Sequence, residues 1–167
     1  MQAWDVRKGA VHMTLSGHTD TITGLSMSPD GLHLLSNAMD NTVRAWDVRP
    51  FCAGSRCARV FKGATHGFEK MLIRCAWDST GRRVGAGSGD HCVYVWDFET
   101  GQLQYKLPGH TGCVNEVRTL RVARRMLSRP ALTVAPTPPQ VSFSPTEPVI
   151  ASCSTDHNIY LGEISAQ

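Results

Sequence analysis

The sequence has no long apolar run, since its longest hydrophobic stretches are four or five residues. A membrane-spanning helix needs about 20 apolar residues, so we expect no contact with a membrane. Residues 1–5 lack the basic and apolar regions of a secretory signal. A glycine-rich phosphate loop and a nucleophile elbow are also missing. We therefore expect no enzyme, no cofactor and no small-molecule substrate.

A metal-binding cysteine framework is missing as well. The six cysteines lie at positions 52, 57, 75, 92, 113 and 153. Only Cys52 and Cys57 lie close in sequence, and no second pair completes a zinc site. The spacing favours reduced thiols in a cytosolic or nuclear protein over a disulfide framework.

Most of the chain lacks the basic character of a nucleic-acid-binding protein. The formal net charge is +3, but residues 118–141 hold five arginines and no acidic residue. The remainder of the chain therefore carries a net charge of −2. We expect RNA to be contacted only indirectly, because overall charge gives no argument for direct binding.

What the sequence does contain is a repeat. A Trp-Asp pair occurs at Trp4, at Trp46, which follows 42 residues later, and at Trp96, a further 50 residues on. A Gly-His pair at Gly17 and another at Gly109 precede two of the units. Each unit contains short β-branched and aromatic runs separated by turn residues, with expected first-unit strands at residues 22–27, 32–36, 42–46 and 58–61.

A period of about 40 to 45 residues with these marks resembles the WD40-repeat family. The resemblance implies an all-β fold, a WD40 β-propeller built from four-stranded blades around an axis. The chain holds about three blades plus an N-terminal stub, which predicts an incomplete propeller, the C-terminal part of a longer one. The expected ranges are residues 1–16 for the end of a preceding blade and 17–62, 63–108 and 109–164 for three repeats.

The third repeat is interrupted by residues 118–141, a basic and proline-rich insertion. Removing it restores the 42-residue spacing of the first interval, between Trp96 and the counterpart position Gly162. The insertion is either an exposed arm that binds RNA or an acidic partner, or unspliced or mispredicted coding sequence. Its position inside an expected strand favours the second interpretation.

Each unit also contains His, Ser and Asp residues that could be mistaken for a catalytic triad. The family resemblance implies instead a buried hydrogen-bonded network of His, Ser, Asp and Trp, in which polar groups satisfy one another. We expect the Ser two residues before the Asp, so Ala38 leaves the first network incomplete and Gly162 leaves the third without its Trp. The expected members are His18, Asp40 and Trp46 in the first blade, His66, Ser88, Asp90 and Trp96 in the second, and His110, Ser154 and Asp156 in the third.

A narrower resemblance is carried by residues that depart from the usual repeat. Asn37-Ala38-Met39 and the ending Tyr160-Leu161-Gly162-Glu163 are similar to WD-repeat proteins of the U5 small nuclear ribonucleoprotein of the spliceosome. This resemblance implies a nuclear, non-catalytic scaffold in pre-mRNA splicing. Its partners would be other spliceosomal proteins, chiefly the large central protein of that particle.

A second hypothesis comes from Trp-Asp-x-Arg sequences that place Arg7 and Arg49 after a strand. They resemble the box by which some propellers dock to the adaptor of cullin-RING ubiquitin ligases. An arginine at an exposed edge can pair with a carboxylate through two parallel hydrogen bonds. Arg7 and Arg49 are therefore candidate docking residues, unless they are simply solvated.

Overall fold

The structure is a computed structural model that describes residues 1–52, 54–118 and 149–163. Strands joined by turns make up this part of the chain, and they form four separate antiparallel sheets. The all-β prediction is confirmed. Each sheet falls within one of the four ranges expected from the repeat, although the repeat boundaries themselves stay a prediction.

The first complete sheet follows the expected unit closely. Its order is β3-β4-β5-β6, so neighbours in sequence are neighbours in the sheet. The strands are β3 (Ile22–Met27), β4 (His33–Ala38), β5 (Thr42–Asp47) and β6 (Cys57–Lys62). The β4–β5 turn contains Asn41 at φ 60°, a left-handed conformation that asparagine tolerates better than most residues. Register across this turn pairs Ala38 with Thr42 and Leu34 with Trp46.

The second complete sheet repeats this plan in the order β7-β8-β9-β10. Its strands are β7 (Cys75–Trp77), β8 (Arg83–Gly87), β9 (Val93–Asp97) and β10 (Leu103–Leu107). Val84 pairs with Trp96, the same register that joins Leu34 to Trp46 in the first sheet. The two sheets are therefore structural copies of each other.

Two smaller sheets lie toward the ends of the chain. One contains β1 (Gln2–Asp5) and β2 (Ala10–Thr14), and the other contains β11 (Val114–Arg118), β12 (Val149–Ser154) and β13 (Ile159–Glu163). The hairpin agrees with the expected N-terminal stub. The expected insertion at residues 118–141, apart from Arg118 at the end of β11, lies outside the described residues.

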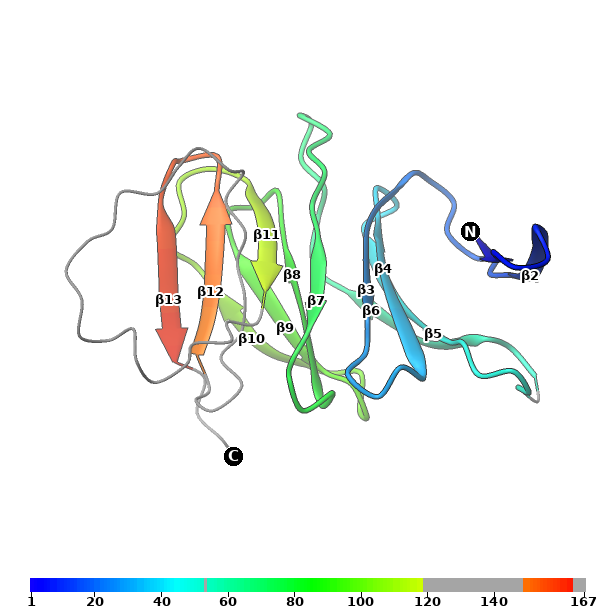
Figure 1. Ribbon diagram of the computed structural model, residues 1–167. Helices are drawn as coiled ribbons and strands as arrows, with labels where there is room; N and C mark the ends of the chain where they lie inside the picture. The colour runs from blue at the N-terminus through cyan, green and yellow to red at the C-terminus, as the bar shows by residue number, and fades with distance from the viewer. Residues whose placement is uncertain (53, 119–148, 164–167) are drawn as a thin grey trace.

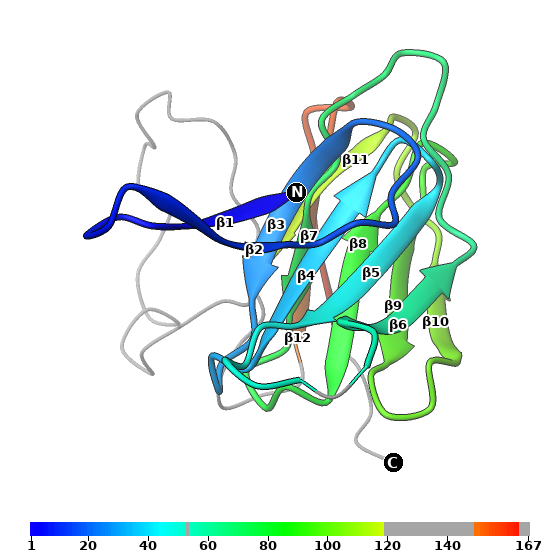
Figure 2. The ribbon, with the colours of Figure 1, turned by 90° about the vertical axis from the view of Figure 1, so that its right-hand side faces the viewer.

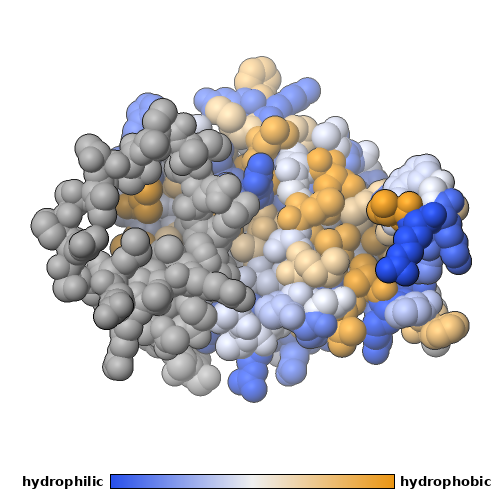
Figure 3. Space-filling view, in the orientation of Figure 1, coloured by the Kyte–Doolittle hydropathy of each residue, from blue (hydrophilic) through white to orange (hydrophobic). Residues whose placement is uncertain are grey.

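Three of the sheets stand side by side with their faces in contact, and β3, β7 and β11 lie along one side of the stack (Figure 1). The view after a quarter turn shows the strands of successive sheets overlying one another, with the β1–β2 hairpin crossing in front of them (Figure 2). Apolar side chains are visible along the side on which β3 and β7 lie (Figure 3). This arrangement is a propeller segment seen from its inner strands.

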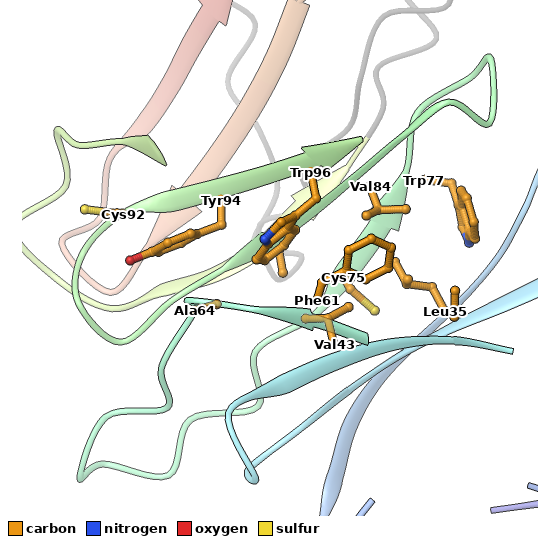
Figure 4. Close-up of a cluster of buried hydrophobic side chains, with 12 residues drawn as sticks. Leu35, Val43, Phe61, Ala64, Cys75, Trp77, Val84, Cys92, Tyr94 and Trp96 are labelled. Atoms are coloured by element: carbon orange, nitrogen blue, oxygen red, sulfur yellow. The ribbon is translucent and has the colours of Figure 1, made fainter. Parts of the chain in front are cut away.

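The main core lies between the first and second sheets. Phe61 on β6, Leu35 on β4 and Val43 on β5 face Trp96, Val84 and Trp77 of the second sheet (Figure 4). The rings of Phe61 and Trp96 are 5.8 Å apart between centroids. A second cluster joins the second sheet to the third through Val93, Val95, Val114, Val117 and Ile150, among others. Each sheet thus buries a face only by stacking on the next, as in other repeat proteins.

Candidate functional site

The first blade contains a closed polar network around His18. Nδ1 of His18 lies 2.8 Å from Oδ2 of Asp40, and Nε2 lies 2.7 Å from Oγ of Ser36. The indole N–H of Trp46 donates to the same Oγ at 2.7 Å. An ionised carboxylate only accepts hydrogen bonds, so Nδ1–H of His18 donates to Asp40. The Ser36 hydroxyl then donates to Nε2 of His18, and the indole N–H of Trp46 donates to Ser36. The network joins the segment before β3, strand β4, the β4–β5 turn and strand β5.

The sequence-based expectation that this network is incomplete is wrong. The serine stands four residues before the Asp, at Ser36, rather than two residues before it, at Ala38. The register explains the difference, because Ala38 pairs with Thr42 at the turn while Leu34 pairs with Trp46. Ser36 lies between these two rows, where its hydroxyl reaches both the imidazole and the indole.

The third blade repeats the arrangement and requires the same correction. Nδ1 of His110 lies 3.0 Å from Oδ2 of Asp156, and Nε2 lies 2.8 Å from Oγ of Ser152, not of the expected Ser154. Ser154 instead accepts a 3.3 Å hydrogen bond from the backbone N–H of Asp156. The ring of Tyr160 lies 4.5 Å from that of His110 between centroids, in an edge-on contact.

In the second blade, the expected residues do not form one network. The position four residues before Asp90 is occupied by Ala86, which has no hydroxyl. The indole N–H of Trp96 donates to the carbonyl of Lys62 at 3.1 Å, and Ser88 accepts from the backbone N–H of Thr65 at 2.9 Å. The ring nitrogens of His66 are buried and have no hydrogen-bond partner among the described residues. Burial lowers the pKa of His66.

Asp90 is bound by two residues that the sequence did not indicate. The Tyr94 hydroxyl donates to Oδ2 of Asp90 at 2.7 Å, and Nζ of Lys106 lies 2.9 Å from the same oxygen. Burial raises the pKa of Asp90, but hydrogen bonds from Ser88, Tyr94 and Lys106 outweigh it and lower the pKa to about 2. In the first blade, Thr42 was likewise missed, although its hydroxyl donates to Asp40 at 2.6 Å.

These networks are placed for stability rather than for chemistry on a substrate. The side chains of His18 and Asp40 are 4% and 6% exposed, and Ser36 is fully buried. The Ser36 oxygen already accepts a hydrogen bond from Trp46, so a substrate would have to displace that indole. A nucleophile would need an open approach to the reacting group.

Acid should weaken the first and third blades through these networks. Burial raises the pKa of Asp40, but hydrogen bonds from Thr42, His18 and the Thr19 N–H outweigh it and lower the pKa to about 2. Burial also raises the pKa of Asp156, but hydrogen bonds from the backbone N–H groups of Asn158 and Thr111 and from His110 outweigh it and lower the pKa to about 2. Their folded pKa values lie below the ordinary 3.8, so the stabilisation is fully present above pH 4.

We expect the free energy of unfolding to fall as the pH drops from about 4 to about 2, because protonation removes the acceptor charge of both carboxylates. Urea unfolding at a series of pH values measures this dependence. The variant Asp40→Asn should have a lower free energy of unfolding than the wild type at pH 6. Its free energy of unfolding should also fall less than that of the wild type when the pH is lowered. An unchanged acid dependence in the variant would contradict the role given to Asp40.

The candidate docking arginines differ in their contacts. The guanidinium of Arg49 forms an ion pair with Asp47, with Nε at 2.9 Å from Oδ2. The hydrogen bonds from Arg49 hold the pKa of that carboxyl far below its usual range. For Arg7, only the backbone N–H has a described contact, a 2.9 Å hydrogen bond to Asp5. Arg49 is therefore bound within its own blade.

Neither a metal site nor a membrane-spanning segment emerges from the described residues. No group of three or more potential ligands gathers there, and all six cysteines are free. Burial raises the pKa of the Cys75 thiol to about 12, which makes this thiol unreactive. Within residues 1–52, 54–118 and 149–163, no helix is long and apolar enough to cross a membrane.

The chain is similar in sequence to known proteins. The U5 small nuclear ribonucleoprotein 40 kDa protein of Bos taurus is 46% identical over 151 residues, which cover 90% of this chain and 36% of the relative. Pre-mRNA-splicing factor cwf17 of Schizosaccharomyces pombe is 43% identical over 165 residues, covering 99% of this chain and 41% of the relative. The chain thus spans about two fifths or less of the length of these relatives.

Solved structures show the same fold at low sequence identity. The structure of U3-55K superposes with a TM-score of 0.65 at 20% identity, covering 90% of this chain and 38% of that chain. The profile of the WD40 family, described as WD domain, G-beta repeat, matches residues 9–47, 55–97 and 139–161. The first match runs from β2 to β5 and the second from β6 to β9, so each begins on the last strand of one sheet and ends on the third strand of the next. The chain belongs to the WD40-repeat family.

Proposed function

We propose that this chain acts in pre-mRNA splicing as a non-catalytic scaffold, as a WD-repeat component of the U5 small nuclear ribonucleoprotein in the nucleus. The observation that carries the proposal is the 46% identity over 151 residues with the U5 small nuclear ribonucleoprotein 40 kDa protein of Bos taurus. The similarity to cwf17, a pre-mRNA-splicing factor, points in the same direction. The partners are other spliceosomal proteins, chiefly the large central protein of the particle.

Asn37, one of the residues that depart from the usual repeat, has a structural role. Asn37 is buried and donates from Nδ2 to the carbonyl of Ile73 at 3.1 Å. The Thr23 hydroxyl donates to the same carbonyl at 2.7 Å. Asn37 therefore ties the first blade to the segment that enters the second, which gives a physical reason for an asparagine at this position.

A scaffold also needs exposed contact residues, and the β6–β7 connection offers them. This loop projects beyond the strands between the first and second sheets (Figure 1), and Phe68 and Leu72 within it are strongly exposed. Lys70 in the same loop adopts φ 49°, which is unusual for a long side chain. Exposed apolar residues on a rigid framework suit protein contacts, so the loop is a candidate contact for a spliceosomal protein.

The ubiquitin-ligase alternative receives no support from the relatives, whose names are those of splicing proteins. It also requires a free arginine, and the guanidinium of Arg49 already forms an ion pair with Asp47. Breaking that pair to bind an adaptor would leave the largely buried Asp47 carboxylate without its partner.

Affinity purification of the tagged chain from nuclear extract tests the proposal. We expect U5 proteins to be recovered, with and without ribonuclease, because protein contacts rather than RNA hold the chain. Arg49→Ala is the matched variant, since it should leave this recovery unchanged. Recovery of a cullin-RING adaptor that is lost in Arg49→Ala, without U5 proteins, would contradict the proposal.

A further inference from the structure

The β6–β7 connection is longer than the corresponding connections of the other two blades. In each blade a glycine opens the segment that leads to the innermost strand: Gly17, Gly63 and Gly109. The cross-strand register aligns one residue of each innermost strand: Leu25, Cys75 and Val117. The strand residue follows the glycine by eight positions in the first and third blades and by twelve in the second. The four extra residues let this loop project beyond the strands (Figure 1).

The base of the loop is fixed between described sheets on both sides. The backbone N–H of His66 donates to Oδ1 of Asn41, in the β4–β5 turn of the first blade, at 2.6 Å. The backbone N–H of Arg74 donates to the carbonyl of Asn115, on β11 of the third blade, at 2.7 Å. Ile73 beside it is only 1% exposed. A loop held in this way presents its tip in a defined position, which lowers the entropy cost of binding a partner.

The tip of the loop presents two apolar side chains and one cation. Phe68 is fully exposed and Leu72 is 66% exposed. Lys70 lies between them in sequence and is also exposed. Its ammonium group has no hydrogen bond or ion pair with any residue that the structure describes. The three side chains are therefore available to a partner.

The backbone of Lys70 has a conformation that a long side chain disfavours, with φ at 49°. The other described non-glycine residues with positive φ share one position, directly after the Asp of the turn between the second and third strands of a blade: Asn41, His91 and His157. Lys70 lies outside these repeated turns. Glycine would adopt the same conformation without strain, so a lysine here lowers stability. Such strain at an exposed charged residue is a reason to look for a function.

These side chains fit another protein better than RNA or a membrane. One lysine next to Glu69 cannot neutralise a series of phosphates, and a membrane-binding segment is rich in basic residues. We propose that Phe68 and Leu72 insert into an apolar groove of a partner protein, and that Lys70 pairs with a carboxylate at the edge of this groove. The inference rests on the proposed function, because the partner is one of the U5 proteins.

Photo-cross-linking from position 68 tests the proposal. The tagged 167-residue chain carries p-benzoylphenylalanine in place of Phe68 and is irradiated in nuclear extract. We expect cross-links to apolar residues of one U5 protein. The same probe at Phe51, which is 95% exposed on a different loop, should not cross-link to that protein. Phe68→Asp and Leu72→Asp should each lower the recovery of U5 proteins at least about tenfold, as for interface residues that dominate binding, whereas Phe51→Asp should not.

Lys70→Gly separates binding from stability. It removes the backbone strain, so the midpoint of urea unfolding of the isolated chain should rise. It also removes the cation, so the recovery of U5 proteins should fall about two- to fivefold, as for the loss of an exposed ion pair. Lys70→Arg keeps the charge and should keep most of the recovery. A rise in the urea midpoint without any loss of recovery would contradict the role given to Lys70.

The outcomes distinguish this inference from the proposed function. Recovery of U5 proteins by Phe68→Asp at the wild-type level would overturn the inference and leave the proposed function intact. A wild-type chain that recovers no U5 protein would contradict both. Cross-links from position 68 to RNA, to lipid or to the chain itself, in place of a U5 protein, would also overturn the inference.

Discussion

Replacing Phe61 by alanine is expected to lower the free energy of unfolding by about 3 to 5 kcal/mol, the usual loss for a large buried aromatic residue. Phe61 is 1% exposed and its ring lies 5.8 Å from that of Trp96. It comes from the outermost strand of the first blade, yet it fills the junction with the second (Figure 4). The substitution therefore opens a cavity between two blades.

Phe51→Ala provides the matched control, because Phe51 lies ten positions earlier in the same blade and is 95% exposed. Phe51→Ala should change the free energy of unfolding by no more than about 0.5 kcal/mol, as for most surface substitutions. Urea unfolding followed by tryptophan fluorescence measures both variants. Similar losses for Phe51→Ala and Phe61→Ala would mean that the junction between the first two blades is not the main core.

Replacing Ser36 by alanine is expected to lower the free energy of unfolding by about 3 kcal/mol, since each buried polar group left without a partner costs about 1 to 3 kcal/mol. The change removes one acceptor and one donor at once. It leaves the indole N–H of Trp46 and Nε2 of His18 without their bonds of 2.7 Å. Burial prevents water from replacing the hydroxyl.

A double-mutant cycle separates the network from a simple loss of packing. Residues in one hydrogen-bonded network couple, so Ser36→Ala and His18→Ala together should cost less than the sum of the single losses, by at least about 0.5 kcal/mol. Thermal or urea unfolding of the four proteins gives the coupling. Strict additivity would show that His18 and Ser36 act independently.

The repeat and its strands could be predicted from the sequence because both rest on local patterns. The expected strand at residues 42–46 is one residue shorter than β5 at one end, and the expected strand at 58–61 is one residue shorter than β6 at each end. Turn residues such as Asp40 and Asn41 mark the β4–β5 connection independently of tertiary contacts. The family resemblance then fixed how the sheets stack.

The serine of the network could not be placed in the same way. Positions 36 and 38 point to the same face of β4, because side chains alternate with a period of two. Only the cross-strand register shows that Ser36, and not residue 38, lies between the rows of Trp46 and the turn. A comparison of the repeats held a signal, since Ser36 and Ser152 share a position that Ala86 occupies in the second blade.

The contacts of Asp90 could not be predicted from local sequence patterns for a different reason. Lys106 lies on β10, sixteen residues after Asp90, and reaches it only because β10 pairs with β9 and places Lys106 beside Tyr94. The strand pairing passes a register shift between Leu103 and Tyr105. A bulge of this kind changes which side chains share a face, so the contact depends on the folded sheet.

The most direct test of the structural role of the polar networks compares two serines on β12. Ser152→Ala should lower the free energy of unfolding by about 1 to 3 kcal/mol, because His110 Nε2 loses its buried partner at 2.8 Å. Ser154→Ala should cost less than about 1 kcal/mol, because it removes one 3.3 Å hydrogen bond from a turn. Urea unfolding of the two variants side by side decides between them. A larger loss for Ser154→Ala than for Ser152→Ala would contradict the networks described above.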